Sequence, residues 1–310
     1  MMALSEKIQV LTDPDETRAF SRRCRAAGKR IALVPTMGNL HAGHLDLVKS
    51  ARQLADVVIV SIYVNPTQFS KSEDFGVYPR TRERDRALLQ ELQVEATFEP
   101  LTLYHPGRGS STEGQHLAGT DDSPAADSHE TYIQVERLQQ GLCGRSRPHF
   151  FRGVATVVAK LFNILEPDVA VFGRKDYQQW RLICRMVRDL DFGIEIVGMP
   201  ITREADGLAM SSRNSMLTPD ERIQATCIRS SLEAASENLQ SGKLSLLQHV
   251  VSAISQRICD GGGRMDYVEV VDAQELTPVD KIQDRPVVIA VAAWFGSVRL
   301  IDNIEVQVKR

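Results

Sequence analysis

The pattern of apolar and polar positions changes character near residue 200. Up to that point, apolar runs typical of buried strands alternate with segments of helical period. Strands are expected at residues 31–34, 57–64, 96–98, 132–135, 168–172 and 195–197, and helices at residues 45–54, 81–92, 153–165 and 175–190. Continuous apolar strands separated by amphipathic helices favour a parallel sheet covered on both faces. Such a sheet binds ligands at the carboxyl ends of its strands.

Beyond about Pro200 the order is different. Two helices are expected near 219–240 and 244–259, followed by antiparallel strands at 265–271, 287–294 and 298–304. The sequence therefore predicts an α/β fold, with a parallel-sheet N-terminal domain over residues 1–200 and a smaller α+β C-terminal domain over residues 201–310. A hinge is expected near residues 199–207. The segment 107–130 is rich in Gly, Ser, Thr and Asp, which predicts a mobile surface loop.

Composition narrows the class of protein. The chain has 310 residues, 43% hydrophobic and 25% charged, and a formal net charge of −3. This charge gives no overall attraction to nucleic acid or to an anionic membrane. Five scattered cysteines without a C-x-x-C pair fit reduced thiols in a cytosolic protein. The longest apolar run, between Pro286 and Gly296, is too short to span a bilayer, and the acidic and basic residues near the N-terminus are unlike a signal peptide.

The most informative segment is Pro35–His44, PTMGNLHAGH, which follows the first expected strand and opens a helix. His41 and His44 therefore lie in the first helical turn, where free N–H groups and the helix dipole attract anions. Two imidazoles add donors for phosphate oxygens that gain charge in a transition state. Gly43 lets a ligand approach the backbone closely. We interpret the segment as a nucleotide phosphate site.

Metal binding is the alternative for these histidines. An i, i+3 pair can bind zinc, but no glutamate occupies the metalloprotease position, and no cysteine or third histidine is close in sequence. A purely structural pair is the other alternative.

Three further polar segments lie near expected strand ends or near the domain boundary. In Phe172–Gln179, Lys175 is placed to reach triphosphate oxygens, and Asp176 and Gln179 to hold hydroxyls or a metal, although a solvated helix start has the same composition. Met210–Asn214 offers two hydroxyls and a guanidinium for phosphate, or is an ordinary linker. Asn65–Phe69 offers amides for a small polar acid, or is a turn.

A fifth segment, Arg145–Gly153, carries three arginines before an expected helix. These arginines form either an anion site or a solvated charged surface.

Taken together, the segments resemble the pantoate–β-alanine ligase (pantothenate synthetase) family. The matching stretches run in order through nearly the whole chain: PTMG at 35–38, HxGH at 41–44, NPTQF at 65–69, YPRT at 78–81, LCG at 142–144, GVATVVxKLFN at 153–163, KDYQQ at 175–179 and SSRN at 211–214. HxGH alone marks a wider nucleotidyl-transferring superfamily, whereas its combination with NPTQF and KDYQQ is specific to this ligase. The resemblance implies a Rossmann-like N-terminal domain and a C-terminal lid domain.

The resemblance also implies a two-step reaction. A pantoate carboxylate attacks the α-phosphorus of ATP, which gives pantoyl adenylate and pyrophosphate. The β-alanine amine then attacks the acyl carbon, which releases AMP and pantothenate. This chemistry needs no covalent enzyme nucleophile, only positioning and charge stabilisation.

Site residues follow by the same resemblance. The catalytic residues are His41, His44 and Lys175. ATP binding is expected from Met37, Gly38, His41, His44, Gly173, Lys175, Asp176, Met210, Ser211, Ser212 and Arg213. Pantoate binding is expected from Met37, Asn65, Gln68 and Gln179.

The implied partners are small molecules. The substrates are pantoate and β-alanine, with ATP as the co-substrate. Mg²⁺ offsets the triphosphate charge mostly through phosphate oxygens, without protein metal ligands. The family implies a cytoplasmic homodimer that binds neither nucleic acid nor membrane.

Two departures from the family pattern bear on activity. Arg174 stands where the family usually has Glu, beside Lys175, and its effect depends on whether that position orients the lysine or faces solvent. His149 and Phe150 replace the usual Gly and His, and His149 is strained if the turn needs a positive φ. Two alternatives therefore stay open: a related nucleotidylyltransferase, or a nucleotide-binding homologue with impaired catalysis.

Overall fold

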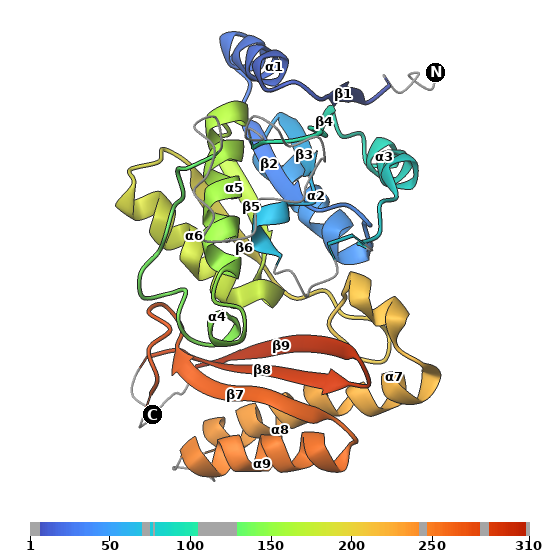
Figure 1. The fold of residues 1–310 in the computed structure, drawn as a ribbon, viewed down its shortest axis with the longest axis vertical. Helices are drawn as coiled ribbons and strands as arrows, with labels where there is room; N and C mark the ends of the chain where they lie inside the picture. The colour runs from blue at the N-terminus through green and yellow to red at the C-terminus, as the bar shows by residue number, and fades with distance from the viewer. Residues whose placement is uncertain are drawn as a thin grey trace. The chain divides into compact units, whose positions relative to one another are not determined.

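The computed structural model describes residues 7–69, 75–76, 78–104, 129–241, 247–279 and 285–307. By internal packing the chain divides into two compact units (Figure 1). The first comprises Met1–Gln139, Gly144–Phe172 and Leu182–Met199, and the second comprises Gln140–Cys143, Gly173–Arg181 and Pro200–Arg310. The second unit thus includes two short segments that precede residue 200.

The first unit is built on a sheet that has six strands within the described residues, in the order β1-β4-β3-β2-β5-β6. The strands are β1 Gln9–Leu11, β2 Ile31–Thr36, β3 Val57–Ile62, β4 Ala96–Phe98, β5 Val169–Gly173 and β6 Glu195–Met199. The pairs β1–β4, β4–β3, β3–β2 and β2–β5 are parallel. The expected parallel sheet is confirmed, and β1 is a strand that the apolar pattern did not indicate.

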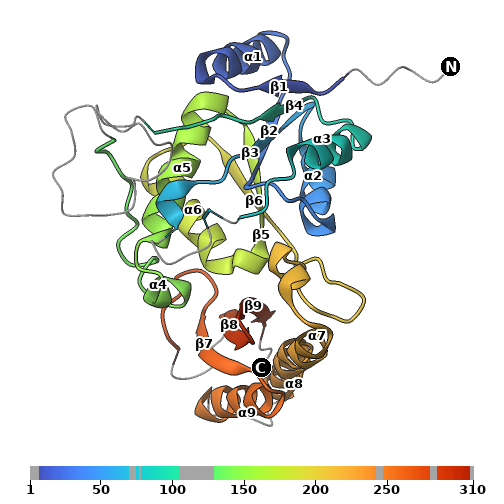
Figure 2. The ribbon, with the colours of Figure 1, turned by 45° about the vertical axis from the view of Figure 1, so that its right-hand side comes forward.

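Helices cover both faces of this sheet. The helices up to residue 189 are α1 Pro14–Ala26, α2 Ala42–Leu54, α3 Arg82–Glu91, α4 Cys143–Ser146, α5 Phe150–Leu165 and α6 Tyr177–Asp189, with a short 3-10 helix η1 at Pro66–Gln68. Figure 2 shows α2 and α3 on one side of the sheet and α5 on the other. The strands β2, β3 and β5 are almost fully buried, because both of their faces are covered.

One expected strand is wrong. Residues 132–135 do not form a strand in the structure. The backbone N–H of Ile133 donates to Thr156 Oγ1 on α5 at 2.9 Å, and the Arg152 guanidinium stacks on the Tyr132 ring at 3.8 Å. The segment therefore packs on α5. Its composition is that of a strand, but it does not pair with a neighbouring strand in the structure.

The second unit contains an antiparallel sheet with two long helices on one face. The strands β7 Arg264–Asp272, β8 Val287–Phe295 and β9 Val298–Val306 pair in the order β7-β8-β9. The helices are α7 Pro219–Ala225, α8 Cys227–Gln240 and α9 Leu247–Asp260, and 3-10 helices occur at η2 Arg174–Asp176 and η3 Ser212–Met216. The expected antiparallel strands are confirmed.

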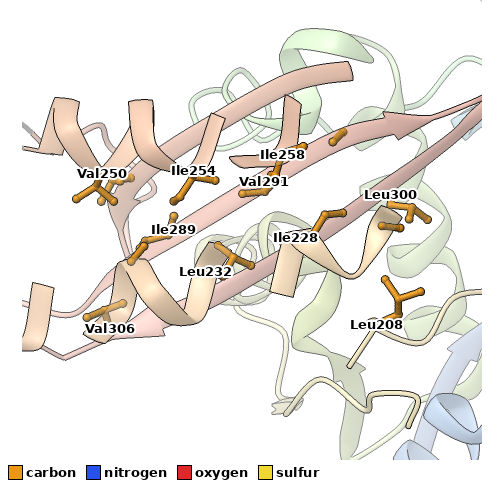
Figure 3. Packing of buried hydrophobic residues seen from close by; sticks show 14 of the residues in the cluster. Leu208, Ile228, Leu232, Val250, Ile254, Ile258, Ile289, Val291, Leu300 and Val306 are labelled. Carbon is orange, nitrogen blue, oxygen red and sulfur yellow. The ribbon is translucent and has the colours of Figure 1, made fainter. Parts of the chain in front are cut away.

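The core of the second unit lies between β8 and the two helices. Figure 3 shows Ile289 and Val291 of β8 beside Leu232 of α8 and Ile254 of α9. These four residues are 0–1% exposed, so this face of the sheet is closed to water. Burial of each such side chain stabilises the unit by about 1.5–3 kcal/mol before entropy is counted.

Two other expectations concern single segments of the chain. The helix expected at 219–240 is divided at Thr226, whose hydroxyl donates to the carbonyl oxygen of Ile223 at 2.7 Å and ends α7. The mobile loop expected at 107–130 lies almost entirely outside the described residues. Among the helices of the described part, we find none with the length and apolar character needed to cross a bilayer.

Candidate active site

The chain turns sharply where β2 ends, before the two histidines. The Thr36 hydroxyl donates to the Ser61 carbonyl oxygen at 2.7 Å and accepts the Gly38 N–H at 3.2 Å. Gly38 has a φ of +82°, which residues with a Cβ rarely adopt. A Cβ there would also lie 3.1 Å from Asp85 Oδ2. The backbone conformation therefore favours glycine at position 38, and a Cβ there would also force its neighbours to shift by a few tenths of an ångström.

The Asp85 carboxylate organises this turn from α3. It accepts the backbone N–H groups of Asn39 and Leu40, each at 2.9 Å, and the Thr81 hydroxyl at 3.1 Å. The side chain is fully buried, so its charge is balanced by these donors. Sequence reasoning missed Asp85. The available signal was an acidic residue four positions before Leu89, on the face of the helix that is buried.

His41 and His44 stack at the amino end of α2. His41 is the N-cap in extended conformation, and His44 is the third residue of the helix. The His41 N–H donates to His44 Nδ1 at 3.3 Å, and the ring centroids are 4.0 Å apart. Because Nδ1 accepts a hydrogen bond, the neutral His44 ring carries its proton on Nε2. That nitrogen is a hydrogen-bond donor at a helix N-terminus, as phosphate binding needs.

Three of the expected pantoate residues are joined by hydrogen bonds. Gln68 Nε2 lies 3.1 Å from Met37 Sδ, and Gln68 Oε1 accepts from Asn65 Nδ2 at 3.0 Å. Met37 follows β2, and the other two residues follow β3, at the start and end of the η1 turn. The adjacent parallel strands β2 and β3 end side by side, which brings these residues together as the sheet topology predicts.

The hydrogen-bonding capacity of Asn65 is used within the protein. Its Nδ2 also donates to the Gly153 carbonyl oxygen at 3.2 Å, and its Oδ1 accepts from Thr67 and Tyr104, each at 2.9 Å. Burial raises the pKa of Tyr104, so its hydroxyl stays protonated and donates. Asn65 is 1% exposed. Its side chain therefore fixes the Gln68 amide, and both the nitrogen and the oxygen of that side chain are engaged within the protein.

The segment before α5 contacts the same residues. The Arg147 guanidinium donates to the Gln68 carbonyl oxygen at 3.3 Å and stacks 3.8 Å from the Phe150 ring. His149 has a φ of −93°, so the turn imposes no positive φ on it. The substitution of His149 for glycine is thus tolerated by the backbone, and Phe150 supports Arg147.

After β5 the chain enters the second unit at η2, where Lys175 and Asp176 lie. Gly173 ends β5, and Lys175 Nζ is 3.6 Å from Asp176 Oδ2. Lys175 is about four-fifths buried, whereas Asp176 is nearly half exposed. Gln179 follows on α6 and is partly exposed. The lysine thus presents a cation just beyond the carboxyl end of a strand.

Arg174, which is positive where the family pattern has a negative Glu, contacts a residue of β9. Its guanidinium pairs with the Glu305 carboxylate at 3.3 Å and lies 5.9 Å from the Trp180 ring. Lys175 pairs with its own neighbour Asp176. Arg174 therefore forms an ion pair with Glu305, whereas a glutamate at position 174 would repel Glu305.

The loop expected to grip phosphate forms a capped turn. Ser211 is the N-cap of η3, and its hydroxyl accepts the Arg213 N–H at 3.2 Å. The Met210 N–H donates to the Thr202 carbonyl oxygen at 2.9 Å, which fixes the entry into the turn. Ser212 and Arg213 are partly exposed. Two hydroxyls and a guanidinium are thereby held within a few residues.

Among the described residues, no three His, Cys, Asp or Glu side chains cluster in a way that could hold a metal ion.

The candidate residues fall into two groups. Met37, Gly38, His41, His44, Asn65 and Gln68 lie together in the first unit, at the ends of β2 and β3. Gly173, Lys175, Asp176, Gln179, Met210, Ser211, Ser212 and Arg213 belong to the second unit.

Comparison with known proteins assigns a family. The sequence model of the family described as pantoate-beta-alanine ligase matches residues 9–305. A pantoate–beta-alanine ligase of Oryza sativa subsp. japonica is 52% identical over 99% of this chain and 100% of that protein.

Solved structures agree with this match. The pantothenate synthetase of Thermus thermophilus has a TM-score of 0.81 and 38% identity, over 97% of this chain and 100% of that one. The pantoate-beta-alanine ligase of Francisella tularensis has a TM-score of 0.72 and 30% identity, over 96% of this chain and 97% of that one. The two histidines at the start of α2, the amides after β3 and the lysine after β5 thus stand in a chain that belongs to the pantoate–β-alanine ligase family.

Proposed function

We propose that this chain condenses pantoate with β-alanine in two steps, at the expense of ATP. In the first step, a pantoate carboxylate oxygen forms a bond to the α-phosphorus of ATP, and the bond to the β-phosphate oxygen breaks. Pyrophosphate leaves. In the second step, the β-alanine nitrogen bonds to the acyl carbon and loses a proton, and AMP leaves as the carbon–oxygen bond breaks. The products are pantothenate, AMP and pyrophosphate.

The observation that carries this proposal is the imidazole pair at the amino end of α2. His44 keeps Nδ1 engaged by the His41 backbone, which leaves an Nε2 proton on the neutral ring. A donor of this kind strengthens its hydrogen bond as a phosphate oxygen gains charge in the transition state. We assign His41 and His44 to the phosphates of ATP, with Met37 and Gly38 supporting the nucleotide.

The remaining roles follow from chemistry. Lys175 supplies a positive charge to the phosphates, and Ser211, Ser212 and Arg213 grip them with hydroxyl and guanidinium donors. Gly173 and Met210 contribute backbone to the nucleotide site, and Asp176 contacts its ribose. Gln68 and Gln179 hold the hydroxyls and carboxylate of pantoate, and Asn65 acts through Gln68.

Several wider assignments belong to the same proposal. The Francisella tularensis relative was solved with beta-gamma ATP and beta-alanine, which supports these as ligands here. Mg²⁺ accompanies ATP and offsets its charge, mostly through phosphate oxygens. The enzyme acts as a cytoplasmic homodimer. Residues 1–200 bind ATP and pantoate, and residues 201–310 act as a lid that moves when ATP binds. An unchanged scattering radius with and without ATP and pantoate would contradict a large lid movement.

The decisive experiment separates the two steps. Purified protein is mixed with Mg-ATP and pantoate, with and without β-alanine, and pyrophosphate, AMP and pantothenate are measured. We expect pantoate-dependent pyrophosphate in both mixtures, and AMP and pantothenate only when β-alanine is present. Adenylate that stays on the product without any need for the amine would indicate a nucleotidylyltransferase. Tight ATP binding without pyrophosphate would indicate an impaired homologue.

A further inference from the structure

Two neighbouring residues of β9 hold the two loops of the second unit that carry phosphate-binding side chains. Asp302 and Asn303 are 4% and 7% exposed, although both are polar. Buried polar side chains persist where they are hydrogen-bonded. The partners of this pair lie far away in sequence, in η2 and in the chain around residues 203–207.

Asn303 holds the backbone beneath Lys175. Its side-chain amide donates to the carbonyl oxygens of Arg174 and Lys175, each at 3.0 Å. One amide group carries two N–H donors, and both are used here. Asn303 therefore fixes the backbone around Lys175. Both of these hydrogen bonds go to backbone oxygens, so neither involves the side chain of the lysine.

Asp302 holds the other loop through Arg203. Its carboxylate accepts hydrogen bonds from the two terminal guanidinium nitrogens of Arg203, at 2.8 and 2.9 Å. The same guanidinium also donates to the Gly207 carbonyl oxygen at 3.0 Å. Arg203 also pairs with Ala209 through an antiparallel bridge. This small hairpin ends immediately before Met210, so its position sets the start of the 210–213 turn.

The geometry of a strand explains how one pair serves two loops. Successive side chains of a strand point to opposite faces, so Asp302 and Asn303 face different ways from one rigid element. The Asn303 N–H also donates to Asp302 Oδ1 at 2.8 Å, which orients the carboxylate. β9 is paired with β8 along its whole length, so the support is stiff.

We propose that Asp302 and Asn303 are positioning residues for ATP: Asn303 places Lys175, and Asp302, through Arg203, places the Ser211–Arg213 turn. This inference rests on the proposed role of those loops in phosphate binding. Stabilisation of a charged transition state requires donors held in place before the reaction, and misplacement by about 1 Å costs up to about 10²-fold in rate. β9 supplies this placement through its hydrogen bonds to Arg203 and to the backbone of Arg174 and Lys175.

The test measures kcat and the KM for ATP and for pantoate in Asn303→Ala and Asp302→Asn. For each variant we expect the KM for ATP to rise and kcat to fall, with kcat/KM for ATP about 10-fold to 10²-fold lower. The KM for pantoate is expected to change less than about twofold. Asn303→Ser, which keeps one donor, is expected to recover part of the loss and replaces Asn303→Ala if that variant does not fold.

The matched control is Val306→Ala on the same strand. Val306 is fully buried in the core with α8, so truncation creates a cavity, and the hydrogen bonds described above that hold the two loops come from Asp302 and Asn303. We expect a lower melting temperature and an unchanged KM for ATP. If Val306→Ala raises the KM for ATP as much as Asn303→Ala does, the effect of β9 is general stability, and the proposal fails.

A double-mutant cycle separates this inference from the proposed function. In a Lys175→Ala background, Asn303→Ala is expected to add less than about a twofold loss, because the side chain it places is gone. If Lys175→Ala and Arg213→Ala keep normal kcat/KM for ATP, the assigned phosphate roles fail. If those variants are impaired while Asn303→Ala and Asp302→Asn behave as the unaltered protein, the positioning role alone fails.

Discussion

The carboxylate of Asp85 accepts the backbone N–H of Leu40 at 2.9 Å, across 45 residues of sequence. This bond ties α3 to the turn that precedes His41. It makes the position of the histidines depend on a buried charge that belongs to a different helix.

Replacement of Asp85 by asparagine tests this dependence. The new amide would keep one acceptor oxygen and bring an NH₂ group toward a backbone N–H, so one donor loses its partner. We expect Asp85→Asn to lower the free energy of unfolding by about 1–3 kcal/mol and to slow pantoate-dependent pyrophosphate release. The matched control is Glu83→Gln, exposed on the same helix. Equal behaviour of the two variants in denaturant titration and assay would contradict the bracing role.

Loss of the His44 imidazole is expected to act on chemistry more than on stability. His44→Ala should lower adenylate formation at least about 10²-fold, the scale of one lost transition-state donor. His249→Ala, on an exposed face of α9, serves as the control and should be silent. The measurement is single-turnover pyrophosphate release, with thermal melting beside it. Normal turnover in His44→Ala would remove His44 from the mechanism.

Asn65 and Gln68 are expected to behave as one unit. Each single change to Ala should raise the KM for pantoate about 10-fold, because Asn65 acts by orienting the Gln68 amide. The double variant should be no worse than about twofold beyond the Gln68→Ala variant. Steady-state kinetics with pantoate as the varied substrate measures the coupling. Multiplicative effects would mean that Asn65 contributes independently of Gln68.

We expect the protein to tolerate loss of the positive charge at position 174 but to be destabilised by a negative charge there. Arg174→Gln removes a partly exposed ion pair with Glu305 and should cost less than about 1 kcal/mol, with turnover within about threefold. Arg174→Glu places two carboxylates together and should be less stable than Arg174→Gln. Adding Glu305→Arg to Arg174→Glu should restore stability. Failure of this charge swap to restore stability would show that Glu305 is not the partner that matters.

The Cys227 thiol is expected to react slowly with alkylating reagents. Burial raises its pKa from an ordinary value near 9 to about 11, so little of the Cys227 thiol is ionised at pH 8, whereas Cys259 is exposed at the surface. Iodoacetamide should therefore label Cys259 at least about 10-fold faster, as peptide mass spectrometry can measure. Labelling of Cys227 first would contradict the assignment.

The same pKa has a consequence for stability. Folding favours the neutral thiol, so the contribution of Cys227 is fully present below pH 9 and is lost as the pH rises from 9 to 11. The alkaline decline in denaturation midpoint should be smaller in Cys227→Ala than in the unaltered chain. An identical decline would indicate that other groups account for it.

Much of this molecule is determined by local sequence. The apolar runs that became β2, β3 and β5 and the helical periods of α2, α3 and α5 were predictable, because burial on both faces or on one stripe leaves a direct trace in residue type. The placement of His41, His44, Gln68 and Lys175 after strand ends was predictable for the same reason. A parallel sheet then brings the ends of neighbouring strands to one edge.

Only the tertiary structure decided which distant groups meet. Residues 132–135 have the composition of a strand, but Ile133 gives its N–H to Thr156. Asp85 and Asn303 look like ordinary polar residues in sequence, yet each satisfies backbone groups more than 40 positions away. Such partners depend on strand order and helix packing, which periodicity does not encode. The physical reason is that period reports burial, whereas the pairing of buried polar groups is a property of the assembled fold.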